Sequence, residues 1–289
     1  MERDARLLVD LLRDRNPVVR ELGQHYLVDT SVLNAAIELA GDISEHHILE
    51  IGCGPGSLTH HLLRTGARVS AIEIDEGSME HMHRHFEEEI ESEQLTLFPG
   101  DALTVEWPTD IDAIVANIPY QISSPLLERM QREVRTIPAV LLVQDEFADR
   151  MAMSIGPLDR GPLGLSLWLD YDIEMGRGVP PSCFSPQPRV TSRLIRLEPI
   201  DRLAALDSGI DRRMFRQITS QCFSDRRRKL RNLLKRAPRR LSRIPGWHRE
   251  RWQGAIQSLL DHPLMEERPD MLEPEDWLDL CIQISSFEP

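Results

Sequence analysis

The sequence predicts an α/β protein, a doubly wound and mostly parallel sheet followed by a small α-helical C-terminal domain. Short apolar runs alternate with helical patterns over the first two-thirds of the chain, which is typical of a parallel sheet. A glycine-rich turn follows the first of these runs. From about residue 200 the chain consists of arginine-rich helical segments broken by prolines. We therefore expect a helical arm (1–20), an α/β domain (21–200) and a helical domain (201–289).

Five apolar, β-branched runs predict the parallel strands. They are His47–Ile51, Ala67–Asp75, residues 94–101, Ile111–Ile118 and Ala139–Gln144. Helical patterns lie between or after them, at 57–65, 76–92, 125–134 and 145–153. The runs at 163–175 and 190–199 resemble a closing β-pair, which we expect as an antiparallel edge. The proline-rich stretch between them, 178–190, is expected to be a loop.

Composition excludes several classes of protein. No apolar run approaches the ~20 residues needed to cross a bilayer. The first 17 residues mix charges with leucines and predict an amphipathic helix, unlike a signal peptide, so we expect a cytoplasmic protein. The four cysteines, Cys53, Cys183, Cys222 and Cys281, are far apart and suggest neither a zinc site nor disulfides. We expect a monomer.

Charge is distributed unevenly along the chain. The net charge is −13, yet residues 212–251 contain fifteen Arg or Lys and only Asp225 and Glu250 as acids. That segment carries +13, which leaves −26 on the rest of the chain. A basic segment on an acidic chain is where a phosphate backbone can dock. The leucines of Asp225–Arg240 have helical spacing, so we expect a helix with its arginines facing phosphates.

Three strand ends carry residues suited to an adenosine-containing ligand. Gly52, Gly54 and Gly56 follow the first strand and allow a ligand to approach the backbone at a helix N-terminus. Glu73 ends the second strand and can accept hydrogen bonds from ribose hydroxyls. Asp101 follows the third strand and can accept one from an exocyclic amine. The carboxyl ends of parallel strands share one edge of the sheet, so these groups should converge.

The fourth strand ends in Asn117, Ile118, Pro119 and Tyr120. An exocyclic amine of a base is a poor nucleophile, because its lone pair is delocalised into the ring. The Asn117 side-chain oxygen and the Ile118 carbonyl can accept its hydrogens, and Pro119 keeps the backbone rigid. Tyr120 can stack on a base withdrawn from its helix. This arrangement predicts methyl transfer to a base amine, in which positioning carries most of the catalysis.

With these motifs the chain resembles the S-adenosylmethionine-dependent rRNA adenine N6-dimethyltransferases of the KsgA type, in particular their archaeal branch. The resemblance covers nearly the whole chain. It implies a Rossmann-like class I methyltransferase fold and dimethylation of two adjacent adenosines near the 3′ end of 16S rRNA during small-subunit biogenesis. The motifs that carry it are GQHYLVD (Gly23–Asp29), EIGCGPGSLT (Glu50–Thr59), NIPYQISSPL (Asn117–Leu126), CFSPQPRVTS (Cys183–Ser192), FSDRRRKLRNLL (Phe223–Leu234) and RPDMLEPEDWLDL (Arg268–Leu280).

The resemblance also implies roles for individual residues. Phe184 would be the second ring that sandwiches the flipped adenine. The cofactor S-adenosyl-L-methionine would be bound by His25, Leu27, Glu50, Gly52, Gly54, Gly56, Glu73, Asp101 and Asn117. The rRNA of the small subunit or its precursor would contact Arg226, Arg227, Arg228, Lys229 and Arg231. No metal is implied, and the pair His81 and His85 has no third ligand in view.

The chain departs from the family pattern in one region. Asp145 stands where a lysine is usual, and the family's aromatic residue within 156–166 is missing. Two other functions share much of the sequence pattern. One is a large-subunit rRNA adenine methyltransferase, and the other is a ribosome-assembly or RNA-binding factor that has lost catalysis. The intact glycines, Glu73, Asp101 and NIPY argue against that loss, and nothing resembles the hydride-transfer site of an NAD-dependent enzyme.

Overall fold

The computed structural model describes residues 4–16, 23–157, 159–205 and 210–288. The chain divides into two compact units. Unit 1 comprises Met1–Ala148 and Asp172–Pro199, and unit 2 comprises Asp149–Tyr171 and Ile200–Pro289. The expected domain boundaries assign Asp149–Tyr171 to the α/β domain instead, because an apolar run does not reveal which core it joins. Of the expected N-terminal arm, residues 1–3 and 17–20 lie outside the described part.

A seven-stranded sheet in the order β4-β3-β2-β5-β6-β9-β7 forms the centre of unit 1. The pairings β3–β4, β2–β3, β2–β5 and β5–β6 are parallel, and β9 joins β6 antiparallel. This sheet confirms the α/β fold class predicted from the alternating pattern. The strands are β1 (Tyr26–Leu27), β2 (His47–Ile51), β3 (Arg68–Glu73), β4 (Leu95–Pro99), β5 (Ala113–Asn117), β6 (Ala139–Gln144), β7 (Tyr171–Val179), β8 (Phe184–Ser185) and β9 (Ser192–Pro199).

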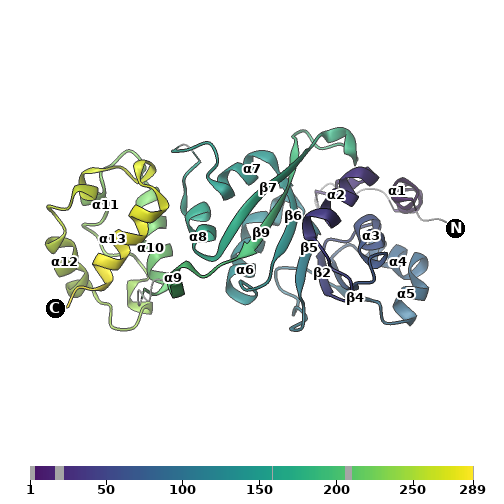
Figure 1. The fold of residues 1–289 in the computed structure, drawn as a ribbon, viewed down its shortest axis with the longest axis horizontal. Helices are drawn as coiled ribbons and strands as arrows, with labels where there is room; N and C mark the ends of the chain where they lie inside the picture. Colours follow the sequence, from purple (N-terminus) through teal and green to yellow (C-terminus); the bar gives the residue numbers. More distant parts are fainter. Residues whose placement is uncertain (1–3, 17–22, 158, 206–209, 289) are drawn as a thin grey trace. The chain divides into compact units, whose positions relative to one another are not determined.

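The strand order reverses between β2 and β5. From β2 the chain moves to β3 and β4 on one side, and from β5 it moves to β6 on the other. Because crossovers are right-handed, α3 and α6 cover opposite faces of the sheet, as Figure 1 shows. The helices of this part are α1 (Ala5–Arg13), α2 (Thr30–Ala40), α3 (Ser57–Leu63), α4 (Glu76–His85), α5 (Glu87–Glu91), η2 (Tyr120–Ile122), α6 (Ser123–Glu133), α7 (Asp145–Ala152) and η3 (Pro181–Cys183).

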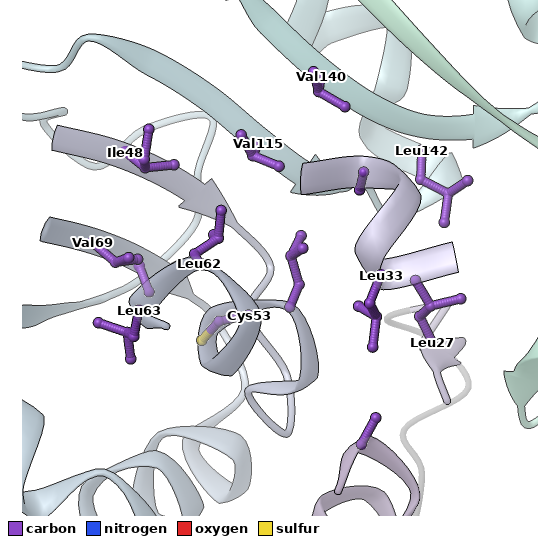
Figure 2. Packing of buried hydrophobic residues seen from close by; sticks show 14 of the residues in the cluster. Leu27, Leu33, Ile48, Cys53, Leu62, Leu63, Val69, Val115, Val140 and Leu142 are labelled. Carbon is purple, nitrogen blue, oxygen red and sulfur yellow. The ribbon is translucent and has the colours of Figure 1, made fainter. Parts of the chain in front are cut away.

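The main core of unit 1 packs α2 and α3 against one face of the sheet (Figure 2). Alternate residues of the strands, such as Ile48, Val69 and Val115, point to this face, where Leu62 and Leu33 meet them. All five are at most 1% exposed. Burying one such side chain contributes about 1.5–3 kcal/mol. This packing holds the strand ends rigidly in place.

Unit 2 is helical and has a core of its own. Its helices surround Trp252 and Trp277, which are both fully buried, together with Phe215 and Leu230. None of the helices in the described ranges of the chain is long and apolar enough to span a membrane. The helices are α8 (Pro162–Asp170), α9 (Arg202–Ala205), α10 (Arg212–Phe223), α11 (Leu230–Leu233), η4 (Leu241–Arg243), α12 (Arg249–Ser258), η5 (Pro263–Glu266), η6 (Pro269–Met271) and α13 (Pro274–Ser285).

Two sequence predictions about secondary structure are wrong. The run 163–175 is predicted to be a strand, but its first part belongs to α8 and only β7 is extended. A segment that is apolar on all sides fits a buried helix as well as a strand. The predicted basic helix of Asp225–Arg240 is likewise only α11, four residues long. Its leucines are buried, but turns on either side of α11 change the direction of the chain.

Candidate functional site

A pocket opens where β2, β3 and β5 end and where the turn after β4 begins. These ends lie on either side of the strand-order reversal, where folds of this kind bind ligands. Gly52, Gly54, Glu73, Asp101 and Asn117, singled out from separate strand ends, all line the pocket together. The other lining residues are Gly23, Gln24, His25, Tyr26, Ile51, Ile72, Ile74, Gly100, Ala102, Ile118, Pro119, Tyr120, Gln121 and Ile122.

The glycine turn after β2 needs its glycines for conformation and for close packing. Gly52 and Gly54 have φ of +74° and +51°, values that side-chain-bearing residues rarely adopt. A Cβ on Gly52 would lie 3.3 Å from Cδ of Pro119, and one on Gly54 would lie 2.8 Å from Cε1 of Tyr26. The absence of side chains thus brings the turn against the loop after β5. It also leaves bare backbone facing the pocket.

The carboxylate of Glu73 organises the same turn. Its Oε2 accepts a hydrogen bond from the N–H of Gly54 at 2.8 Å, and Oε1 accepts from the N–H groups of Ile74 and Asp75, each at 2.9 Å. Burial raises the pKa of Glu73, and these N–H groups partly oppose that effect. A carboxylate has about four acceptor positions, so one remains on Oε2. Glu73 therefore has capacity for one ribose hydroxyl, not for two.

Glu50 lies away from the pocket lining. It is 1% exposed, and its Oε2 accepts a hydrogen bond of 2.6 Å from the hydroxyl of Thr59. Burial raises the pKa of Glu50 to about 8, and the nearby charge of Glu73 adds to the effect. At neutral pH the folded protein therefore holds Glu50 mainly as a neutral acid. Its position connects β2 to the first turn of α3, which is a structural task.

The part of the pocket near β3 and β4 combines apolar walls with one acid. Ile74 is 52% exposed although it is a large apolar residue, and it lines the pocket beside Ala102. The Asp101 carboxylate accepts a hydrogen bond from the N–H of Leu103 through Oδ1 at 2.8 Å. Its Oδ2 accepts no hydrogen bond within the described part of the chain. Apolar walls with one free acceptor suit a flat, amine-bearing ring.

Asn117 ends β5 at the centre of the pocket. Its Nδ2 donates a hydrogen bond to the main-chain oxygen of His25 at 3.1 Å. A carbonyl can only accept, so this contact determines which end of the amide is the nitrogen. Among the described residues no donor reaches the Asn117 Oδ1. The acceptor that amine chemistry requires is therefore available in the pocket.

Tyr120 begins η2 and stands beside His25. Its hydroxyl is 2.6 Å from Oγ of Ser192, which is fully buried at the start of β9. The rings of His25 and Tyr120 are nearly parallel, with centroids 5.9 Å apart and an interplanar angle of 28°. The His25 Nδ1 donates to the main-chain oxygen of Pro186 at 2.9 Å. Both rings are thus held by hydrogen bonds to residues of the segment from β8 to the start of β9.

Three further residues assigned to the site by resemblance do not line this pocket. Phe184 is 2% exposed and packs in the core of unit 1, where β8 pairs with β1 opposite Leu27. Leu27 is buried in the same core. Gly56 caps α3, and a Cβ there would lie 2.5 Å from the ring of Phe86. The roles predicted for these residues stay predictions, and for Phe184 the ring would have to leave the core.

Sequence reasoning missed several contributors to the site. Ile74, Ala102 and Gln121 line the pocket, and Ser192 anchors Tyr120. An isoleucine directly after the acid at the end of a strand is the signal that was available for Ile74. Ser192 had no such signal, because its partner is 72 residues away.

Asp145, the departure from the family pattern, forms an ion pair of 2.6 Å with Arg193 on β9. The charge of the aspartate is therefore compensated within unit 1. The rings of His81 and His85 have centroids 4.3 Å apart and are tilted, with an interplanar angle of 41°. Across the described ranges no group of three or more metal-ligating side chains occurs.

The basic residues predicted to contact RNA lie in unit 2. Arg226 places its guanidinium over the ring of Phe223, 5.2 Å from the centroid. Lys229 and Arg231 both form ion pairs with the carboxylate of Glu266, the former at 2.7 Å. Arg227 and Arg228 are exposed. Part of the positive charge counted along the sequence is therefore compensated by an acid from η5.

Comparisons with known proteins point to one family. The sequence model of the family described as "Ribosomal RNA adenine dimethylase" matches residues 16–243. The chain is 37% identical over 279 residues to the "Probable ribosomal RNA small subunit methyltransferase A" of Haloarcula marismortui, a match that covers 93% of each chain. It resembles the crystal structure of a dimethyladenosine transferase from Plasmodium falciparum, with a TM-score of 0.75 and 26% identity over 90% of this chain and 97% of that one. A second solved structure, the 23S rRNA methyltransferase ErmE, matches with a TM-score of 0.64 and 25% identity over 90% and 99%.

Proposed function

Because the chain belongs to the ribosomal RNA adenine dimethylase family, we propose that it methylates adenosines of small-subunit rRNA. It would transfer methyl groups from S-adenosyl-L-methionine to N6 of two adjacent adenosines near the 3′ end of 16S rRNA, giving N6,N6-dimethyladenosines. The observation that carries this proposal is the position of Asn117, with an unengaged side-chain oxygen, in the pocket beside Gly52 and Glu73.

The residues of the pocket fit S-adenosylmethionine. Gly52 and Gly54 present bare backbone, and a Cβ at Gly52 would close the approach to Pro119. Glu73 has one acceptor position for a ribose hydroxyl, and Asp101 has a free oxygen for the adenine amine. When bound, the cofactor supplies an electrophilic methyl group on a positively charged sulfur. These residues would hold its adenosine part near β3 and β4.

Residues at the end of β5 would activate and position the target amine. The Asn117 Oδ1 and the Ile118 carbonyl would accept its two hydrogens and so favour the tetrahedral geometry in which the nitrogen lone pair is available. Once the methyl–sulfur bond had broken and the N–C bond had formed, the methylated amine would be acidic and would lose a proton to solvent, so no charged base is needed. A monomethylated amine still offers one hydrogen to Asn117. The neutral amide therefore permits the second transfer, and positioning provides most of the rate.

Tyr120 would hold the target base after its withdrawal from the RNA. Stacking on an aromatic ring stabilises an extruded base by about 1–3 kcal/mol. The hydrogen bond to the buried Ser192 restrains the ring of Tyr120 before the base arrives. His25, nearly parallel to Tyr120 on the pocket wall, restricts the space into which the base can turn.

The proposal has a direct test. Unmodified small ribosomal subunits are incubated with the protein and isotope-labelled S-adenosylmethionine, and the rRNA is digested and analysed by mass spectrometry. We expect labelled N6,N6-dimethyladenosine from two neighbouring positions near the 3′ end. Label confined to large-subunit rRNA, or no label although the cofactor binds, would contradict the proposal.

The similarity to ErmE supports one alternative, methylation of large-subunit rRNA. The same assay with large-subunit rRNA as acceptor separates the two. An assembly factor without catalysis is the other alternative, and equilibrium binding of S-adenosylmethionine tests it, because such a factor has no need to keep the pocket. For the enzyme we further propose a monomer that acts in the cytoplasm on the assembled small subunit or its precursor.

A further inference from the structure

A groove on unit 2 concentrates positive charge just after the motif FSDRRRKLRNLL (Phe223–Leu234). It has a volume of about 470 Å³ and lies between the segment that follows α11 and the first turns of α12. Leu241 and Pro238 are buried beneath it. The lining residues are Lys235, Arg236, Ala237, Pro238, Arg239, Leu241, Ser242, His248, Arg249 and Gln253.

Hydrogen bonds to main-chain carbonyls hold the segment at the end of α11 and after it, which forms one wall of the groove. Gln221 on α10 donates from Nε2 to the oxygen of Leu233 at 2.9 Å and to that of Arg236 at 2.7 Å. Trp252 on α12, which is fully buried, donates from Nε1 to the oxygen of Leu234 at 2.9 Å. The backbone that carries Lys235 and Arg236 is therefore held in place on one side of the groove.

Among the described residues, four cations of the groove have no acidic partner. Lys235, Arg236, Arg239 and Arg249 are exposed and form no ion pair among the described residues. No Asp or Glu in those residues lines the groove. The nearest charged contact is that of His248 with Glu250 at 3.8 Å, and this carboxylate is 90% exposed.

By contrast, Lys229 and Arg231 share the carboxylate of Glu266. Arg251 is also engaged, since it donates to the main-chain oxygens of Gly246 and Phe287 and lies over the ring of Trp247. The groove therefore contains four exposed cations of the segment 212–251 that have no ion pair among the described residues, in addition to the exposed Arg227 and Arg228 singled out from the sequence. The first turn of α12 adds the positive end of its helix dipole.

We propose that this groove binds the phosphodiester backbone of the rRNA substrate, as a second contact beside the exposed Arg227 and Arg228. The proposal rests on the function proposed above and adds a docking site to it. Guanidinium groups are planar forks that match phosphate oxygens in pairs, which favours RNA backbone over less dense anionic surfaces. Such contacts fix the position of the RNA without reading its sequence.

The test measures binding of fluorescently labelled small-subunit rRNA to the full chain at several salt concentrations. Arg236→Gln, Arg239→Gln and Arg249→Gln are made singly and together. Removing one arginine–phosphate interaction lowers the slope of log affinity against log salt by about 0.7–0.9. We expect each single variant to bind severalfold more weakly with a slope reduced by about one, and the triple variant to bind at least about a hundredfold more weakly.

Arg213→Gln is the matched control. Arg213 is an equally charged residue of unit 2, 58% exposed, but it already pairs with Asp211 at 2.5 Å. Its replacement should change the affinity by no more than about twofold and should leave the slope unchanged. Arg236→Lys and Arg239→Lys should restore most of the slope, because they keep the charge. Circular dichroism establishes that each variant is folded.

An unchanged slope for the triple variant overturns the proposal. The proposal is also overturned if the variants lose affinity only for vesicles of anionic phospholipid or for polyaspartate, since that would assign the groove to a membrane or an acidic protein. S-adenosylmethionine binding and methyl transfer are measured separately. If the groove variants lose rRNA affinity, the proposed role of the groove is supported even when the wild type does not methylate. If the variants bind rRNA normally and still methylate it, the proposed function stands and the proposed role of the groove is wrong.

Discussion

Asn117 donates a hydrogen bond from Nδ2 to the main-chain oxygen of His25 across 92 residues of sequence. The contact joins the end of β5 to the loop before β1. It fixes the amide in one orientation, with the nitrogen turned to the loop and the oxygen left for a ligand. The polarity of the site therefore depends on a backbone carbonyl far away in the chain.

Replacing Asn117 by Ala removes both the acceptor and this link. We expect the rate of methyl transfer to fall by about 10²–10³, the usual cost of deleting one group that stabilises a transition state. Cofactor affinity should weaken far less, because Gly52, Glu73 and Asp101 are unchanged. Single-turnover transfer from labelled cofactor and calorimetric binding measure the two quantities. Asn34→Ala, an exposed residue on α2, is the control; retention of substantial turnover by Asn117→Ala would remove Asn117 from the mechanism.

The hydrogen bond between Tyr120 and Ser192 predicts a graded effect. Tyr120→Phe keeps the ring but loses the anchor, so activity should fall less than tenfold, in line with about 1 kcal/mol for one hydrogen bond. Tyr120→Ala also loses stacking and should cost a further 1–3 kcal/mol, roughly, in binding the extruded base. Ser192→Ala should resemble Tyr120→Phe. Kinetics of the single and double variants provide the check: if the two losses add fully, the hydroxyls do not act together.

The raised pKa of Glu50 predicts that the stability of the folded protein depends on pH. Its folded-state pKa of about 8 exceeds the ordinary 4.5, so the folded protein binds more protons than the unfolded chain between these values. Its contribution is therefore fully present below pH 4.5 and is lost as pH rises to 8, by at most about 1.4 kcal/mol per unit. Glu50→Gln keeps the shape and the acceptor for Thr59. In urea unfolding, the stability of this variant relative to the wild type should increase from about pH 5 to pH 8, while cofactor binding changes little. Stability profiles that stay parallel over this range would refute the raised pKa of Glu50.

His81 predicts the opposite trend. Burial lowers its pKa from 6.5 to about 4, and the positive charges of His85 and Arg84 add to the shift. Between pH 6.5 and about 4, the unfolded chain therefore binds a proton at His81 that the folded protein does not bind. Stability from this residue is present above pH 6.5 and is lost as pH falls toward 4, by at most about 1.4 kcal/mol per unit. His81→Phe should flatten the acid side of the stability profile in urea unfolding, and the full wild-type slope in that variant would exclude His81 as its source.

Secondary structure is predictable where local sequence and burial agree. The strands predicted at His47–Ile51 and Ala139–Gln144 have the bounds that the structure shows, because a central parallel strand is apolar on both faces. The same reasoning fails at residues 163–170. That segment is largely apolar and buried as α8, and periodicity does not distinguish a buried helix from a buried strand.

The site is predictable in part for a similar reason. Gly52, Glu73, Asp101 and Asn117 follow successive strands, and parallel pairing brings such ends to one edge whatever the details of packing. Glu50 belongs to the same motif but points into the interior toward Thr59. The sequence does not reveal that the side chain of Glu50 faces the core while Gly52, two residues later, faces the pocket.

The sequence alone determined the α/β class, the convergence of strand ends on one edge of the sheet, and the chemistry of an amide beside an aromatic ring. These depend on hydrophobic period and on residue type, which are local properties. The tertiary structure decided which acceptors are still free, which arginines are compensated, and where Phe184 lies. Those outcomes depend on partners such as His25, Glu266 and Ser192, which approach only when distant segments pack, since an ion pair or hydrogen bond is set by distance in space and not by separation along the chain.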